Sequence, residues 1–173
     1  PLSDKKNEVL DTMRAIGSTR IVTGKGPGDF DTLDKVKATC DLFNEANAVA
    51  KENGMAFGIH NHWWEYIQVE GRYVYEVMLE HLDPDILLQV DTYWVNTAGV
   101  NPAEVVKLYG SRAALLHIKD GPCVKTEPMT AVGDGVMDIP AIVEAGKPHT
   151  KWMIVEIDRC ATCLLYTSDA ADE

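Results

Sequence analysis

Cysteine, basic residues and long apolar runs are all scarce in this sequence. It has four cysteines among 173 residues, and one of them lies in an unusual C-terminal stretch described below. So sparse a set favours a reducing, cytoplasmic environment over a disulfide-stabilised scaffold. No apolar run is long enough to cross a membrane, so we expect no membrane partner.

The shortage of basic residues bears on possible partners. Sixteen Lys and Arg face 27 Asp and Glu, which gives a formal net charge of −11. Nucleic-acid binding needs clustered positive charge against the phosphates, so no nucleic-acid partner is expected. The hydrophobic fraction of 46% and the length are those of one globular domain with a sizeable core.

The C-terminal stretch has an unusual composition. Residues 163–173 read CLLYTSDAADE and resemble the in-frame translation of a transposon-end sequencing adapter. We therefore assign residues 1–160 to the domain and treat 161–173 as a non-native tail. The pair Cys160 and Cys163 has the spacing of a redox or zinc motif, but its second cysteine would be adapter-derived.

Helical and strand patterns alternate along the chain. Short apolar, often β-branched runs predict strands at 20–23, 55–59, 86–90, 113–116 and 152–155. Apolar spacing and capping residues predict helices at 3–16, 31–53, 73–82, 101–110 and 138–146. The strands are apolar on both faces, as buried parallel strands are. Repeated β-α units predict an α/β fold, either a doubly wound sheet or a (β/α)₈ barrel with about five of its eight strands.

Residues able to bind a metal recur where the predicted strands end. His60, His62 and Glu65 follow the second strand, in the stretch GIHNHWWEY. Later strands are followed by Asp91, His117 and Glu156, one at each strand end. In barrels the active site is assembled at this end of the sheet from different strands. A single such residue would be read as a loop cap or a hydrogen-bonded side chain, but four successive strand ends favour a site.

The ligand types indicate the chemistry. Carboxylates and imidazoles without a thiolate cluster suit a divalent metal such as Mn, Mg, Co or Zn. Such an ion polarises a carbonyl beside a hydroxyl, which acidifies the neighbouring C–H and stabilises an enediolate. A glutamate at the edge of the site could then move the proton.

Other residues near these strand ends have two interpretations each. Trp63, Trp64 and Trp94 could stack on the C–H face of a sugar, or could pack in the core and loops. Lys119 could stabilise an oxyanion, or could be a solvated lysine at a strand end. Residues 133–135, Gly-Asp-Gly, are most simply a turn.

Five short motifs occur in a characteristic order. They are Gly58-Ile-His-Asn-His-x-x-Glu65, Val90-Asp91-Thr92, Leu116-His117-Ile-Lys-Asp120, Gly133-Asp-Gly135 and Val155-Glu156-Ile-Asp158. Together they resemble the xylose isomerase-like TIM-barrel superfamily, and within it the sugar phosphate isomerase/epimerase group, which includes inosose dehydratase-like proteins. The resemblance implies that this chain holds the third to seventh strands of a barrel. Because an open barrel exposes edges and apolar surface, we predict that the chain expressed alone is unstable or aggregates.

The resemblance also implies site residues. Members of the superfamily bind one divalent metal through four strand-end ligands, and three of these match Asp91, His117 and Glu156. We assign the first ligand to Glu65, with His62 as the alternative, because His60 stands where many relatives have Glu. Glu65 and Glu156 inherit the catalytic proton transfer. His60, His62, Trp94 and Lys119 are then expected to bind substrate.

The predicted function is a metal-dependent isomerase or epimerase that acts on a keto sugar or related polyol through an enediolate. An inosose dehydratase-like lyase and a non-catalytic sugar-binding barrel are the alternatives. The superfamily also contains an endonuclease acting on abasic DNA, which the acidic balance disfavours. The sequence does not specify an oligomeric state.

Overall fold

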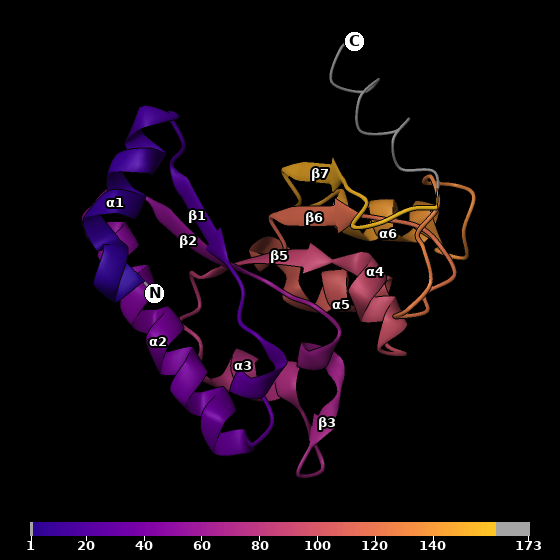
Figure 1. Cartoon of the computed structure of the whole chain (residues 1–173), viewed down its shortest axis with the longest axis horizontal. Coiled ribbons are helices and arrows are strands. Elements are labelled where there is room, and N and C mark those ends of the chain that lie inside the picture. Colours follow the sequence, from indigo (N-terminus) through magenta and orange to yellow (C-terminus); the bar gives the residue numbers. More distant parts are fainter. Residues whose placement is uncertain (1, 162–173) are drawn as a thin grey trace.

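A five-stranded parallel sheet forms the centre of the computed structural model, which describes residues 2–161 (Figure 1). Its strand order is β1-β2-β5-β6-β7, so consecutive β-α units lie side by side. The strands are β1 (Arg20–Thr23), β2 (Ala56–His60), β5 (Leu87–Asp91), β6 (Leu115–Ile118) and β7 (Trp152–Val155). This sheet is the predicted partial (β/α)₈ barrel, and the fold prediction is confirmed.

Six helices accompany the sheet. They are α1 (Leu2–Ala15), α2 (Leu33–Glu52), α3 (Val74–His81), α4 (Thr92–Thr97), α5 (Pro102–Tyr109) and α6 (Ile139–Gly146). Single turns of 3₁₀ helix lie at Pro27–Asp29, Trp64–Tyr66 and Gly110–Arg112, and a two-stranded hairpin is formed by β3 (Gln68–Val69) and β4 (Arg72–Tyr73). Within residues 2–161, no helix is both long and apolar enough to cross a membrane.

Helix α2 shows why these segments fold locally as they do. The side chain of Thr32 caps its first turn by accepting a hydrogen bond from the Lys35 amide. Its buried residues include Val36, Cys40 and Phe43, which recur every three or four positions and so lie on one face. The helix therefore packs one apolar stripe against the sheet and leaves its charged face in solvent.

Alternation along the strands separates a helix-covered face from an open face. In β5, Leu88 and Val90 are buried in the core, whereas Gln89 and Asp91 have the opposite orientation. The same alternation places Leu116 in the core and His117 on the other face of β6. Polar residues at the strand ends therefore lie on the face opposite the one that packs in the core.

Helix α4 and the β3–β4 hairpin were missing from the sequence prediction. Helix α4 consists of TYWVNT, residues with modest helix propensity, and it forms because the Asp91 side chain accepts a hydrogen bond from the Trp94 amide at its start. The β3–β4 hairpin turns at Glu70 and Gly71, both with positive φ, as its short turn requires.

Strand β7 departs from the expectation that these mostly apolar strands are buried. All four of its side chains are exposed, from 36% for Ile154 to 71% for Val155. Among residues 2–161 it pairs only with β6, so it forms one edge of this sheet. The predicted aggregation of the chain stays a prediction, and this apolar edge is where it would begin.

Candidate metal centre at the carboxyl ends of the strands

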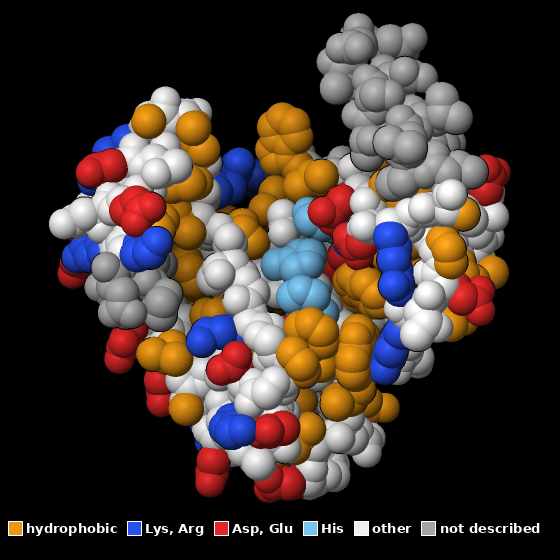
Figure 2. Space-filling view, viewed as in Figure 1, with side chains coloured by type: hydrophobic (Ala, Val, Ile, Leu, Met, Phe, Trp, Pro, Cys, Tyr) orange, Lys and Arg blue, Asp and Glu red, His pale blue; other side chains and the backbone are white. Residues whose placement is uncertain are grey.

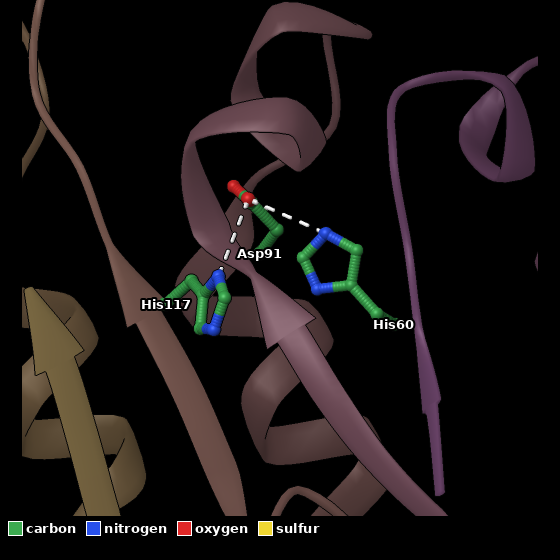
Figure 3. A group of neighbouring side chains, drawn as sticks. All are labelled: His60, Asp91 and His117. Carbon is green, nitrogen blue, oxygen red and sulfur yellow. Dashed lines mark ion pairs between the residues drawn. The ribbon is translucent and has the colours of Figure 1, made fainter. Parts of the chain in front are cut away.

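Strand register brings the predicted strand-end residues together. Asp91 and His117 are direct partners across β5 and β6, and His60 is the partner of Gln89 across β2 and β5. His60, Asp91 and His117 come from three adjacent strands, and their side chains point toward one another (Figure 3). The carboxyl edge of the sheet is therefore the position of the candidate site.

The donor atoms of His60, Asp91 and His117 converge. Asp91 Oδ2 lies 3.8 Å from His60 Nε2 and 3.9 Å from His117 Nδ1 (Figure 3). One donor atom from each residue falls within 4.8 Å of the others. Atoms bound to one first-row ion at about 2.0–2.3 Å lie roughly 3–4.5 Å apart, so this spacing fits a divalent metal.

Two of these atoms are buried without a satisfying partner. Asp91 Oδ2 and His117 Nδ1 form no hydrogen bond of acceptable geometry, although charged groups lie within ion-pair distance of both. Buried polar atoms in proteins are normally paired, and a role in binding an ion is one reason for an exception. The orphaned atoms therefore support the view that this donor set fits a cation.

Glu156 and Lys119 extend the cluster toward β7. Glu156 follows β7 and continues its ladder, since its amide donates to the Ile118 carbonyl. Glu156 Oε2 lies 2.6 Å from His117 Nδ1 and 2.9 Å from Lys119 Nζ. Lys119 is only 2% exposed, so its interpretation as a solvated strand-end lysine is wrong.

The environment keeps His60 neutral. Burial, together with the nearby charges of His117, His62 and Lys119, lowers the pKa of His60 to about 4. Its Nδ1 lies 3.1 Å from Gln89 Oε1, which holds the ring with Nε2 toward Asp91. A neutral, oriented imidazole is the form that binds a metal.

Burial and charged neighbours shift the pKa values of Asp91, Glu156 and Lys119 in opposite directions. Burial raises the pKa of Asp91, against the opposing effect of Lys119. Burial would also raise the pKa of Glu156, but its hydrogen bond and ion pair with Lys119 prevail and lower it. For Lys119 itself, burial would lower the pKa, and the surrounding carboxylates outweigh it and raise the pKa well above its usual value.

Glu65 and His62 form a separate pair beside this cluster. Glu65 is 3% exposed, and its Oε2 accepts a hydrogen bond from the His62 amide at 2.8 Å. Its Oε1 lies 3.7 Å from His62 Nδ1. The structure does not group Glu65 with His60, Asp91 and His117 as a ligand set among the described residues. The predicted role of Glu65 as first ligand stays a prediction.

The aromatic residues differ in their surroundings. Trp64 stacks on His62 with ring centroids 4.1 Å apart, and its indole N–H donates to the Lys25 carbonyl. Trp63 lies beneath the Lys125 ammonium, 3.2 Å from the ring centroid. Trp94 packs against the core beside Tyr93, and its backbone amide donates a hydrogen bond to Asp91. Its predicted substrate contact stays a prediction.

Three supporting residues were not identified from the sequence. Asn61 binds both the amide and the carbonyl of Asp91, which joins the loop after β2 to the end of β5. Gln89 orients His60, and Asp158 binds Lys119. Gln89 and Asp158 lie two positions from Asp91 and Glu156, so strand alternation could have placed them on the site's face.

A buried aspartate organises the long loop between β6 and α6. The Asp120 carboxylate accepts hydrogen bonds from the amides of Gly121, Gly133 and Met137 at 2.8–3.1 Å. Gly135 packs so closely that an added Cβ would lie 2.0 Å from Asp120 Oδ1. The Gly-Asp-Gly segment is thus a turn, as predicted, and it closes around this carboxylate.

The cluster is accessible from one face of the molecule. Figure 2 shows histidine side chains gathered at the centre of a hollow, with acidic side chains beside them. A small molecule could therefore approach the strand ends from this side.

Comparison with known proteins places the fold in a family. The family model described as "Xylose isomerase-like TIM barrel" matches residues 7–165. The chain belongs to the xylose isomerase-like TIM barrel family. No curated protein matches the chain.

Solved structures agree with this family. Two sugar phosphate isomerase/epimerase structures from Parabacteroides distasonis are 26% and 25% identical, with TM-scores of 0.78 and 0.74. They cover 90% and 92% of this chain, which spans 56% and 61% of theirs. A probable 3-DHS dehydratase from Bacillus anthracis is 12% identical, with a TM-score of 0.70. The match covers 88% of this chain and 62% of the dehydratase, which shows the shared fold.

Proposed function

We propose that the protein is a divalent-metal-dependent sugar isomerase or epimerase that acts on a keto sugar or related polyol through an enediolate. The observation that carries the proposal is the convergence of donor atoms from His60, Asp91 and His117, two of which are buried and form no hydrogen bond of acceptable geometry. The likeness to the xylose isomerase-like family and to two sugar phosphate isomerase/epimerase structures supports it.

The residues proposed to hold the ion are His60, Asp91, His117 and Glu156. When bound, the ion would supply Lewis-acid polarisation of the substrate carbonyl and of the adjacent hydroxyl. The chain itself fixes the donors, because strand register and the bonds from Asn61 and Gln89 hold them in place. Donors fixed before the ion arrives need little reorganisation on binding.

Proton transfer is assigned to two carboxylates of the site, those of Glu156 and Glu65. Glu156 is the base that removes the proton from the carbon next to the substrate carbonyl, since its side chain is 42% exposed toward the open side. Its lowered pKa keeps it ionised and able to accept that proton. In an epimerase, Glu65 would return a proton to the opposite face of the same carbon, as the resemblance implies.

The geometry of Glu65 favours a second candidate, a β-eliminating lyase. Its carboxylate is already held by the His62 amide, which leaves Glu156 as the open carboxylate of the pair. Elimination can use one carboxylate, which removes the C–H proton and then donates that proton to the departing β-hydroxyl, which leaves as water. Product analysis with an inosose separates the reactions, because the lyase forms an unsaturated product and the epimerase a stereoisomer.

Solvent deuterium exchange tests the proposal directly. Ketohexoses and an inosose are incubated with the protein and Mn²⁺ in D₂O, and NMR follows the C–H beside the carbonyl. We expect exchange, its loss by a factor of roughly 10³ or more in Glu156→Gln, and no change in the exposed control Glu144→Gln. Sugar binding without any exchange would instead indicate a non-catalytic barrel.

A further inference from the structure

The Lys119 ammonium lies inside a cage of three carboxylates. Its Nζ is 2.9 Å from Asp91 Oδ2, 2.9 Å from Glu156 Oε2 and 2.6 Å from Asp158 Oδ1. The lysine side chain is 2% exposed and that of Asp91 is fully buried. The positive charge of Lys119 therefore offsets part of the repulsion among the three carboxylates.

Two of these contacts involve oxygens proposed to bind the metal. Asp91 Oδ2 faces Lys119, and it is also the atom toward which His60 Nε2 and His117 Nδ1 converge. Glu156 Oε2 lies close to both Lys119 Nζ and His117 Nδ1. The ammonium thus shares its oxygens with the cation site rather than lying behind it.

The Lys119 ammonium and a bound divalent ion would compete for these oxygens. Two cations that share one oxygen are separated by about 4–5 Å, and their repulsion is strong where water is excluded. A lysine ammonium is a compact charge on a flexible stem, so it can move between acceptors. Asp158 is the acceptor that lies outside the proposed ligand set, and its side chain is 34% exposed.

We propose that Lys119 is a resident counter-cation of the metal site. Without metal, its ammonium holds Asp91 and Glu156 in their binding positions. When a divalent ion binds, the ammonium gives up these two oxygens and keeps its bond to Asp158. This inference rests on the metal dependence in the proposed function, and it makes metal affinity the outcome of an exchange between two cations.

Direct metal titration tests the exchange without any assay of activity. Isothermal titration calorimetry with Mn²⁺ alone compares the wild type with Lys119→Met and with Lys119→Gln, whose amide can still donate to the carboxylates. Both variants remove the competing charge, so we expect roughly tenfold or greater tightening of Mn²⁺ binding. The matched control is Lys147→Met, since Lys147 forms an exposed pair with Glu144 and should leave the affinity unchanged.

Thermal melting gives a second readout. Metal-free Lys119→Met should melt at a lower temperature than the wild type, because its carboxylates lack a counter-charge, and Mn²⁺ should raise its melting temperature by more than it raises that of the wild type. Unchanged or weaker Mn²⁺ binding in both Lys119 variants, with binding by the wild type intact, would overturn the inference and leave the proposed function standing. Absence of Mn²⁺ binding in all proteins would overturn both.

Discussion

The candidate site has two sides that are held in different ways. The β5–β7 side comprises Asp91, His117, Lys119, Glu156 and Asp158, which sit on paired strands and contact one another through charges. The β2 side comprises His60, His62, Trp64 and Glu65, most of which lie in a loop and a 3₁₀ turn. Strand pairing and ion pairs fix the first side, whereas ring stacking and backbone hydrogen bonds fix the second.

This difference predicts how each side responds to substitution. Removal of one member of a buried charge cluster leaves the others uncompensated, which is a large penalty. Loss of a packing or hydrogen-bond contact in a loop is smaller and can be absorbed by local movement. Substitutions on the β5–β7 side should therefore lower the free energy of unfolding by more than those on the β2 side, whatever their effect on the site's chemistry.

Asp91→Ala is the substitution with the largest expected effect. It removes the buried partner of Lys119 and the side-chain cap of α4. We expect the free energy of unfolding to fall by about 3–5 kcal/mol in urea denaturation. Asp11→Ala, in an exposed pair with Arg14, is the control and should leave the unfolding curve unchanged. A loss for Asp91→Ala as small as that of the control would remove the distinction between the two sides.

Gly135→Ala tests the loop that follows the β5–β7 side. An added Cβ would lie 2.0 Å from Asp120 Oδ1 and 2.3 Å from the Gly121 nitrogen, so the loop must shift. We expect a loss of about 1–3 kcal/mol in the free energy of unfolding. Gly28→Ala, with open space around its Cβ position, should be close to neutral. Equal melting temperatures for the two variants would show that the loop is not closed on Asp120 in solution.

The β5–β7 side was largely predictable from the sequence because a parallel sheet converts chain position into spatial position. Asp91, His117 and Glu156 end adjacent strands, so register alone brings them to one edge. The burial of Lys119 was not predictable in this way. It depends on the carboxylate of Asp158, which follows β7 and to which the sequence assigned no role.

The β2 side was predicted less completely for a physical reason. Beyond His60 the chain leaves the sheet, and hydrogen bonds local to the loop decide where each side chain points. The sequence placed Glu65 near the site but could not show that the His62 amide binds its carboxylate. Helix α4 was missed for a related reason, since an aspartate read as a strand-end ligand also serves as a helix cap.

Glu65→Gln tests whether Glu65, on the β2 side, positions His62 or binds the metal. The substitution keeps a hydrogen-bond acceptor for the His62 amide but removes the negative charge. If Glu65 positions His62, as this bond indicates, we expect a loss of about 1–2 kcal/mol in stability and unchanged Mn²⁺ affinity by calorimetry. A hundredfold weaker Mn²⁺ affinity would instead make Glu65 a metal ligand, as the family resemblance implies.

Gly24→Ala should have the smallest effect on stability and yet disturb the β2 side. An added Cβ would lie 3.2 Å from both His62 Cε1 and the His60 carbonyl oxygen, so the imidazole must move by a few tenths of an ångström. Because the loop can absorb this movement, we expect the free energy of unfolding to change by less than about 0.5 kcal/mol. The His62 imidazole NMR signals should shift, and the rate of deuterium exchange should fall several-fold.

The matched control for this prediction lies two residues away in the same loop. Gly26→Ala places its Cβ 4.0 Å from its nearest neighbour, Asp29 Oδ2, and should change neither the His62 signals nor the exchange rate. If Gly24→Ala were as silent as Gly26→Ala, His62 would not be held by close packing against Gly24, and the β2 side would owe its order to the Trp64 stacking and the Glu65 hydrogen bond. A loss of stability comparable to that of Asp91→Ala would instead mean that both sides of the site fold as one unit.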